Sequence, residues 1–124
     1  MSGVFELVHA VRFEAARQLT GVPPGHPCGR LYGLGFDLEI HVRGTVDPVT
    51  GFVIDFGEID KAFAPLHALL DHDHLNRLPG LENPTSEVLV AWIWDRLAPA
   101  LPGLCQLVLR ENPRSRVIYR GPGG

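Results

Sequence analysis

Apolar and polar residues alternate without a break between positions 36 and 43. One face of this segment carries Phe36, Leu38, Ile40 and Val42, and the other carries Asp37, Glu39, His41 and Arg43. A period of two residues over this length predicts a strand with one buried face. If the strand runs back through the preceding glycines, Tyr32 and Leu34 lie on the buried face, close to the thiol of Cys28.

Three further segments have the composition of strands. Residues 4–13 are rich in β-branched and apolar side chains, and residues 106–111 and 116–120 flank an Asn-Pro turn. A turn that contains Pro48 and Gly51 predicts that residues 52–54 return as a short strand beside the central one. In an extended continuation of the first strand, Phe13, Ala15 and Arg17 share a face.

Two segments have the apolar spacing of amphipathic helices. Asp55 and Glu58 match a capping box at the start of the first helix, which should end near Leu70. Asn83 and Pro84 suit the N-cap and first turn of the second helix, which should stop before Pro99. The predicted buried stripes are Ile59, Phe63, Leu66 and Leu70 in the first helix, and Val88, Leu89, Trp92, Ile93 and Leu97 in the second.

The predicted order is therefore strand, strand, helix, helix, strand, strand. Strands grouped apart from helices indicate the α+β class, here a four-stranded antiparallel sheet with two helices on one face. A length of 124 residues fits a single domain spanning residues 1–124. Such a sheet has exposed edges, and pairing of edges between subunits is one way to remove them.

Composition narrows the class of partner. A formal charge of −3 and the lack of a basic cluster in the sequence argue against nucleic acid. No apolar run reaches the ~18 residues that a membrane span needs, and the first residues do not form a signal peptide. Two cysteines, Cys28 and Cys105, do not make a disulfide framework, so a cytoplasmic location is expected.

Several short motifs, taken together, resemble one known family. They are Phe13-Glu14-Ala15-Ala16, Cys28 followed by Gly33 and Gly35, Gly51 with Ile54-Asp55-Phe56, Leu70-Asp71-His72 with Leu75-Asn76, Glu82-Asn83-Pro84-Thr85 with Glu87, and Glu111 with Tyr119. The chain resembles the 6-pyruvoyl tetrahydropterin synthases, most closely the bacterial 6-carboxytetrahydropterin synthases of queuosine biosynthesis. The resemblance implies the tunnelling fold (T-fold), in which ββααββ subunits join into a β-barrel, commonly as a homohexamer of two trimers, with active sites between subunits.

The resemblance also implies an activity and roles for individual residues. Members of the family act as lyases on 7,8-dihydroneopterin triphosphate, eliminating triphosphate and reshaping its three-carbon substituent. The bacterial branch releases acetaldehyde. By this resemblance, Cys28 as a thiolate abstracts a proton, Asp71 and His72 assist proton transfer, and Glu111 binds the pterin. A carboxylate suits that last role because it accepts two adjacent N–H donors in a bidentate geometry.

The same resemblance identifies a departure. Three family histidines hold a catalytic zinc ion, and the corresponding positions here are Arg17, Tyr32 and Leu34. A catalytic zinc site needs about three protein ligands and one open position. Leucine cannot ligate a metal, arginine repels a cation, and a neutral tyrosine is a poor donor. We therefore expect no zinc and no other cofactor at this position.

Each candidate also has a structural interpretation. Cys28 could be a small buried hydrophobe, the Asp71-His72 pair could end a helix, and Glu111 could be a solvated charge. Arg17 could pair with an acidic neighbour, replace the positive charge of the metal, or bind a carboxylate or phosphate of a different pterin. Tyr32 could act as an acid or a hydrogen-bond donor. Cys105 is expected to fill the core, and His9, His41, His67 and His74 to lie on the surface.

Two functions follow from the resemblance. The first is a zinc-independent enzyme that acts on 7,8-dihydroneopterin triphosphate or a related dihydropterin by proton transfer and by cleavage of a carbon–carbon bond in the three-carbon substituent. The second is a catalytically inactive pterin-binding paralogue, or a partner subunit of an active homologue. A small-molecule pterin is the expected ligand in both, with neither nucleic acid nor membrane as a partner.

Overall fold

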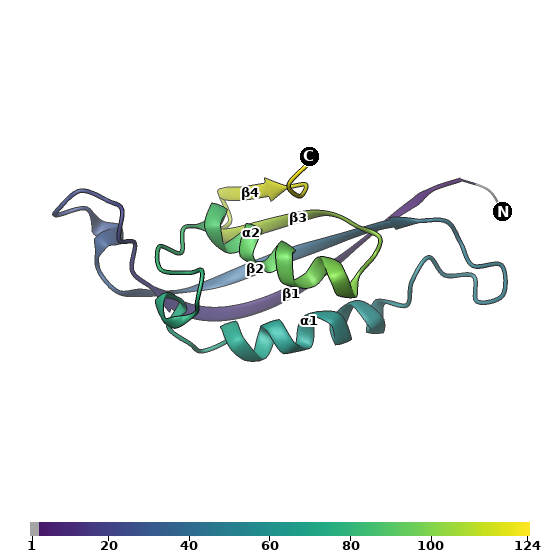
Figure 1. Ribbon diagram of the computed structural model, residues 1–124, viewed down its shortest axis with the longest axis horizontal. Coiled ribbons are helices and arrows are strands. Elements are labelled where there is room, and N and C mark those ends of the chain that lie inside the picture. The colour runs from purple at the N-terminus through teal and green to yellow at the C-terminus, as the bar shows by residue number, and fades with distance from the viewer. Residues whose placement is uncertain (1–2) are drawn as a thin grey trace.

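The computed structural model describes residues 3–124 and has the predicted α+β architecture (Figure 1). The four strands lie in the order β1-β2-β3-β4, and each pairs antiparallel with its neighbour. The elements are β1 (Phe5–Arg17), η1 (Pro27–Gly29), β2 (Tyr32–Gly44), α1 (Phe56–Leu70), η2 (Leu75–Arg77), α2 (Ser86–Leu97), η3 (Ala98–Ala100), β3 (Leu104–Asn112) and β4 (Ser115–Tyr119).

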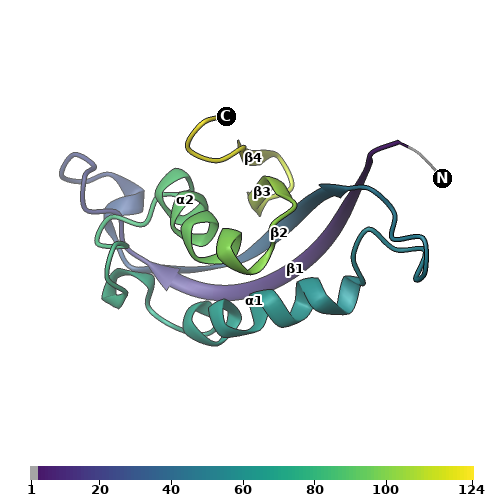
Figure 2. The same ribbon diagram turned by 45° about the vertical axis from the view of Figure 1, so that its right-hand side comes forward.

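Strands β1 and β2 form a long hairpin that is the backbone of the molecule. They pair in register over thirteen residues each, from Phe5 opposite Gly44 to Arg17 opposite Tyr32. Figures 1 and 2 show that this hairpin curves and extends past α1 and α2 at the end that carries the N-terminus. The first strand thus continues to Arg17, which is one of the possibilities left open by the sequence, and Arg17 lies beside the first residue of β2.

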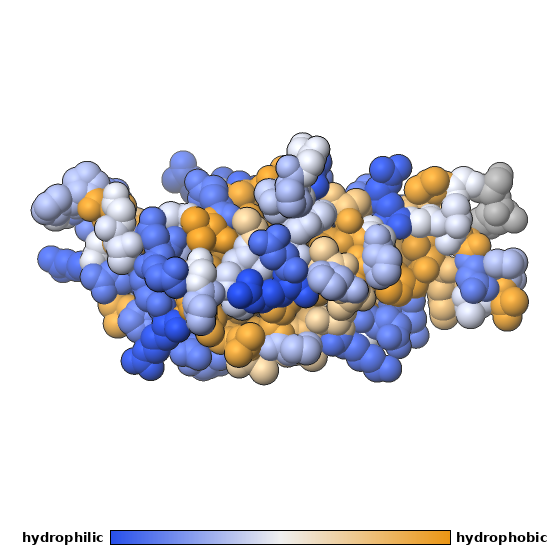
Figure 3. Space-filling view, in the orientation of Figure 1, coloured by the Kyte–Doolittle hydropathy of each residue, from blue (hydrophilic) through white to orange (hydrophobic). Residues whose placement is uncertain are grey.

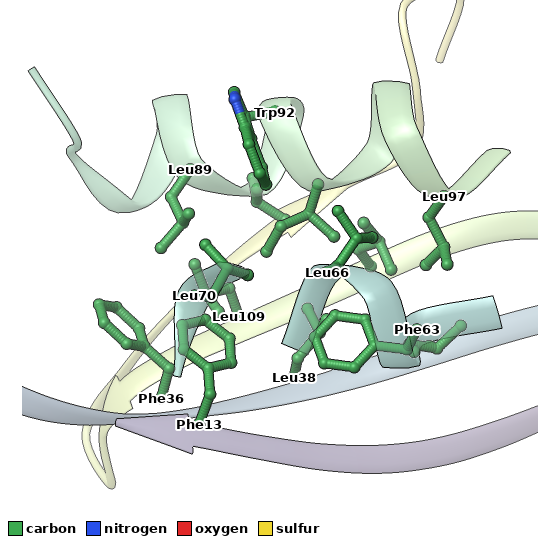
Figure 4. Close-up of a cluster of buried hydrophobic side chains, with 14 of the residues drawn as sticks. Phe13, Phe36, Leu38, Phe63, Leu66, Leu70, Leu89, Trp92, Leu97 and Leu109 are labelled. Carbon is green, nitrogen blue, oxygen red and sulfur yellow. The ribbon is translucent and has the colours of Figure 1, made fainter. Parts of the chain in front are cut away.

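Both helices pack on the face of the sheet that carries the apolar positions of the alternating pattern. The predicted burial of Val88 is wrong, because this residue lies in the first turn of α2 and is 38% exposed. The core cluster draws on α1, α2 and the three longest strands, and Figure 4 shows their side chains meeting between the layers. Phe13 and Phe36 stack there with ring centroids 5.0 Å apart. The labelled members are Phe13, Phe36, Leu38, Phe63, Leu66, Leu70, Leu89, Trp92, Leu97 and Leu109.

The helix starts agree with the sequence in one case and differ in the other. Asp55 caps α1 by accepting a hydrogen bond from the backbone N–H of Gly57 at 2.9 Å. Glu58 bonds Lys61 at 3.2 Å, so the reciprocal contact of a capping box is replaced by a surface ion pair. For α2, the N-cap is Thr85, because the side chain of Asn83 is used elsewhere, accepting from the backbone N–H of Thr20.

One predicted strand is wrong. Residues 52–54 form no strand among the residues that the structure describes. The physical reason is the position of β2, which pairs with β1 on one edge and β3 on the other and therefore offers no free edge to a returning segment.

Within residues 3–124, no helix combines the length and apolarity that crossing a membrane requires.

Apolar side chains also lie on the surface near the N-terminus. Phe5, Phe52 and Phe56 are each about half exposed, and they border a cavity of about 290 Å³ together with Leu7 and neighbouring residues. Figure 3 shows apolar side chains gathered at this end of the molecule, where the hairpin extends past the helices. These residues adjoin one another around the cavity, unlike the single apolar residues that are scattered over most protein surfaces.

The outer edge of β1 is partly covered by the segment that follows α1. Between Arg12 and Ala16, the outward backbone groups of β1 are satisfied by residues 67–73. The contacts join Arg12 O to His67 Nε2, Glu14 N to Asp71 Oδ1, Glu14 O to His72 N, and Ala16 N to Asp73 O.

Candidate active site

Arg17 is almost completely buried, with 3% of its surface exposed, and its guanidinium connects four parts of the protein. Its Nε donates to the hydroxyl of Tyr32 at 2.9 Å, and its Nη1 donates to the carbonyl of Pro84 at 3.1 Å. Its Nη2 donates to Glu111 Oε2 at 2.8 Å. The guanidinium therefore joins β1, β2, β3 and the start of α2 in one polar network.

Glu111 reaches this network from β3, opposite the first turn of α2. Its Oε2 accepts hydrogen bonds from both Arg17 and the hydroxyl of Ser86, the first residue of α2. Burial alone would raise the pKa of Glu111, but the hydrogen bonds from Ser86 and Arg17 lower it below its ordinary value. Glu111 is therefore a carboxylate, and 33% of its side chain remains exposed to an approaching ligand.

Cys28 and Tyr32 lie next to this ion pair. Cys28 is half-buried in η1, where its backbone N–H donates to Nδ1 of His26 at 3.0 Å. Burial raises the pKa of Tyr32, the neighbouring Cys28 adds to this shift, and Arg17 opposes it. Tyr32 thus stays protonated well above neutral pH and has a hydrogen available beside the thiol. The sequence alternation correctly placed Tyr32 near Cys28.

Asp71 and His72 form a second group at the C-terminal end of α1. Asp71 Oδ2 bonds Nδ1 of His72 at 2.8 Å, while Asp71 Oδ1 accepts from the backbone N–H of Glu14 at 2.9 Å. The bonds from Glu14 and His72 lower the pKa of Asp71, and Asp71 raises the pKa of His72. His72 adopts a positive φ of 59° and leaves 75% of its side chain exposed, so the opposite ring atom, Nε2, is free to meet a substrate.

The cavity beside His72 does not include the group around Arg17. A cavity of about 610 Å³ contains His72 and Leu34, but it is not lined by Cys28, Arg17, Tyr32 or Glu111. The cavity is lined by Glu14, Ala15, Ala16, Gly33, Leu34, Gly35, His72, Asp73, His74 and Arg77. The structure therefore brings four of the six predicted residues together and holds Asp71 and His72 separately.

Ser86 is a residue of this network that sequence reasoning missed. It is 6% exposed, and its hydroxyl lies between the Nη1 of Arg17, at 3.3 Å, and the carboxylate of Glu111. It occupies the unassigned position between Thr85 and Glu87 in a motif that the sequence did single out. The sequence signal for Ser86 was therefore a small hydroxyl residue at the start of a helix. A serine at such a position commonly bonds only the nearby backbone, so the signal did not point to the site.

Four histidines were expected on the surface, and that prediction was wrong in part, because all four are half-buried. His9 bonds Asp60 at 2.7 Å, His41 bonds Glu39 at 3.2 Å, and His67 bonds the carbonyl of Arg12. The Nε2 of His74 is buried and has no partner among residues 3–124.

Cys105 is also half-buried at the sheet, where burial and Glu6 raise the pKa of its thiol to about 11.

The residues at the positions that the resemblance assigns to zinc do not fit that ion. Arg17 fills its place with a cation whose donors are bonded to Tyr32, Glu111, Ser86 and the carbonyl of Pro84. Leu34 has no donor atom. In the part of the protein that the structure describes, no group of three or more His, Cys, Asp or Glu side chains is arranged to hold a metal ion.

Comparison with solved structures identifies the fold as the T-fold. The 6-pyruvoyl tetrahydropterin synthase of Caenorhabditis elegans superimposes with a TM-score of 0.89, covering 96% of each protein at 20% sequence identity. A catalytic-residue mutant of the Plasmodium vivax enzyme superimposes with a TM-score of 0.74 at 15% sequence identity, covering 95% of this protein and 98% of its own length. The four-stranded sheet with two helices matches both.

Sequence comparison defines the family. The profile of 6-pyruvoyl tetrahydropterin synthase matches residues 6–122. The 6-carboxy-5,6,7,8-tetrahydropterin synthase of Synechocystis is 39% identical over 118 residues, which cover 89% of this protein and 88% of the relative. The dihydroneopterin monophosphate aldolase of Pyrococcus furiosus is 32% identical, covering 80% and 73%. The chain belongs to the 6-pyruvoyl tetrahydropterin synthase family.

Proposed function

We propose that this protein processes a dihydropterin without zinc, with 7,8-dihydroneopterin triphosphate as the first candidate substrate. The reaction consists of proton transfer and cleavage of a carbon–carbon bond in the three-carbon substituent. The observation that carries the proposal is the Asp71–His72 pair, in which a charged hydrogen bond orients a histidine that lines a cavity of about 610 Å³. A pair of this kind suits general acid–base catalysis. The named activities of the two relatives described above agree with a pterin substrate.

The roles follow from the positions of the side chains. Cys28, as a thiolate, takes a proton from the substituent of the substrate, and His72, oriented by Asp71, returns one. Glu111 binds the pterin ring through its exposed carboxylate. Tyr32 donates a hydrogen bond next to the thiol. Arg17 stabilises the negative charge of Glu111 directly, and through its bond to Tyr32 it stabilises negative charge that develops on an oxygen of the substrate.

Catalysis needs both groups of residues in one site. Since a single subunit holds them apart, we propose that sites form between subunits of a homohexamer, arranged as a dimer of trimers. The apolar surface around Phe5, Phe52 and Phe56 supports an assembly, because it is open to a partner. We further propose a lyase of the queuosine pathway that works in the cytoplasm. Light scattering coupled to gel filtration tests the oligomer.

One observation favours an alternative, a catalytically inactive pterin-binding paralogue or partner subunit. Arg17 and Ser86 both bond Oε2 of Glu111, so one oxygen of the proposed pterin anchor is already occupied. Because Arg17 is buried in this network, its charge is used within the protein rather than presented to solvent. These contacts are compatible with a site that binds a pterin and no longer turns it over.

One experiment separates the two functions. Purified, metal-free protein is incubated with 7,8-dihydroneopterin triphosphate and with 7,8-dihydroneopterin, and products are followed by chromatography and fluorescence. Turnover that is lost in Cys28→Ala and His72→Ala, but not in Cys105→Ala, supports the enzyme. Saturable pterin binding with no product supports the inactive paralogue. Absence of both binding and turnover would rule out a pterin function.

A further inference from the structure

Three arginines surround a cavity of about 270 Å³ at the turn between β3 and β4. Arg110 lies near the end of β3, Arg114 lies in the turn and Arg116 lies near the start of β4, with Pro113 and Ser115 completing the lining. The sequence showed no obvious basic cluster. The hairpin creates one, because Arg110 and Arg116 are cross-strand partners and their side chains leave the sheet on the same face. We call these three residues the arginine cluster.

The positive charge of the arginine cluster is poorly compensated. Arg110 has one acidic contact, at 3.6 Å from Glu39, and its Nε is buried without a hydrogen-bond partner among residues 3–124. Asp37 lies opposite Arg110 on β2, but its carboxylate bonds Arg12 at 3.1 Å. Like charges directly opposite each other in a sheet destabilise it. A bound anion would remove that penalty.

Arg114 and Arg116 form no ion pair within the described residues. The turn that carries them is nevertheless ordered by Asn112, whose Oδ1 accepts from the backbone N–H of Arg114 at 2.8 Å and of Ser115 at 2.9 Å. The backbone of Arg114 is thus fixed at the rim of the cavity before any ligand arrives. Preorganisation of this kind lowers the cost of binding.

The arginine cluster adjoins the proposed pterin anchor. A smaller cavity, of about 140 Å³, is lined by Glu111 and Ser86, and it shares Ser115 and Arg116 with the cavity of the arginine cluster. Glu111 bonds Ser86 on the helix face, whereas Arg110 contacts Glu39 on the other face, so a tail from a ring at Glu111 would reach Arg114 around the end of the β3–β4 turn. An anionic tail would also offset the positive charge of the guanidinium groups, which a neutral tail would not.

We propose that the arginine cluster binds the phosphate groups of a small ligand. Guanidinium groups match phosphate oxygens with paired N–H donors, and several together suit a di- or triphosphate better than a single carboxylate. The phosphates belong either to a phosphorylated dihydropterin at Glu111, which rests on the proposed function, or to a free polyphosphate, which does not. The shared chemistry is a compact phosphate anion.

Calorimetric titration of the metal-free protein with sodium tripolyphosphate tests the site. We expect saturable binding that weakens with added salt, and a loss of affinity of about tenfold or more in Arg114→Gln and in Arg116→Gln. The matched control is Arg43→Gln, an exposed arginine on the other end of the same face, which should change affinity less than about twofold. Equal weakening in all three variants, or no saturable binding to the wild type, would overturn the proposal.

A second titration separates the two sources of phosphate. If the phosphates belong to the pterin, 7,8-dihydroneopterin triphosphate binds more tightly than 7,8-dihydroneopterin, and Arg116→Gln removes most of that difference. If both pterins bind equally while tripolyphosphate still binds, the anion is a free polyphosphate. If neither pterin binds and tripolyphosphate does, the proposed function fails and the arginine cluster stands. Tighter binding of a single-stranded oligonucleotide than of tripolyphosphate would overturn the proposal that the ligand is a small molecule.

Arg114→Lys keeps the charge and removes the paired donors, so its affinity should fall between those of the wild type and Arg114→Gln. Thermal unfolding of every variant is measured in the absence of ligand. An affinity of Arg114→Lys equal to that of the wild type would show that charge alone acts, and would overturn recognition by the guanidinium fork.

Discussion

Arg17 is the residue on which the candidate site depends most. Its replacement by Met keeps much of the length of the residue but removes the cation from Glu111, Tyr32 and the carbonyl of Pro84. We expect the free energy of unfolding to fall by about 2–4 kcal/mol, towards the lower end for a broken buried pair because Glu111 is partly exposed. Urea unfolding followed by circular dichroism measures this change.

Ser86→Ala serves as the control for this prediction, since it removes one hydrogen bond to Glu111 and leaves the ion pair. Its cost should be about 1 kcal/mol. An Arg17→Met variant no less stable than Ser86→Ala would show that the guanidinium does not hold the network together.

The exposed histidine of the Asp71–His72 pair should titrate above its ordinary range. Asp71 raises the pKa of His72 in the folded protein, so the stabilisation from this pair is present at low pH and is lost as the pH rises through the folded pKa. In Asp71→Asn the pKa of His72 should fall, because the charged acceptor is gone. An NMR titration of the ring of His72 in both proteins checks the direction, and an unchanged pKa would contradict the charged pair.

Proximity at the site could be predicted from sequence only where it is local. Alternation along β2 placed Tyr32 near Cys28, and neighbouring positions gave Asp71 with His72. The pairing of Arg17 with an acidic group was one of several open possibilities. Its partner could not be chosen, because the distance between residues 17 and 111 depends on the pairing of β1, β2 and β3 and on where α2 docks.

Each helix start depends on one capping side chain. Asp55 accepts from Gly57 N–H at the start of α1, and Thr85 accepts from Val88 N–H at the start of α2. Replacing either by Ala should lower the free energy of unfolding by about 1 kcal/mol, since a helix donor loses its partner. Asp55→Asn and Thr85→Ser, which keep an acceptor, should cost a few tenths of that. Urea unfolding of the four variants checks this, and equal losses within each pair would contradict capping.

The elements themselves were largely predictable, because each has a local pattern. Alternation gave β2, and apolar spacing gave α1 and α2. Whether the first strand continues past Phe13 was left open by the sequence, since Ala15, Ala16 and Arg17 have little strand preference and are held extended by their pairing with β2. The short strand at residues 52–54 was predicted in error, because a turn shows where the backbone reverses but not whether the neighbouring strand has an unpaired edge.

At the scale of the whole molecule, the presence of Arg17, Tyr32 and Leu34 predicts that the thermal stability of the protein does not depend on zinc. Addition of equimolar zinc, or of a chelator, should leave the melting temperature unchanged, because a ligand stabilises a fold only by binding it. Elemental analysis after dialysis should return no stoichiometric transition metal. A chelator that lowers the melting temperature, with one zinc ion per subunit before treatment, would contradict this.

The covering of β1 by residues 67–73 limits how two copies of this protein can join. From Arg12 to Ala16 the outer edge of β1 is already closed by the same subunit, so among the described residues a strand from a second copy could pair with this edge only nearer the start of β1. In that part of β1, the backbone N–H and C=O groups of Glu6, Val8 and Ala10 point away from β2, as those of Arg12 and Glu14 do. The segment that positions His72 therefore also closes this part of β1 to a strand from a second copy.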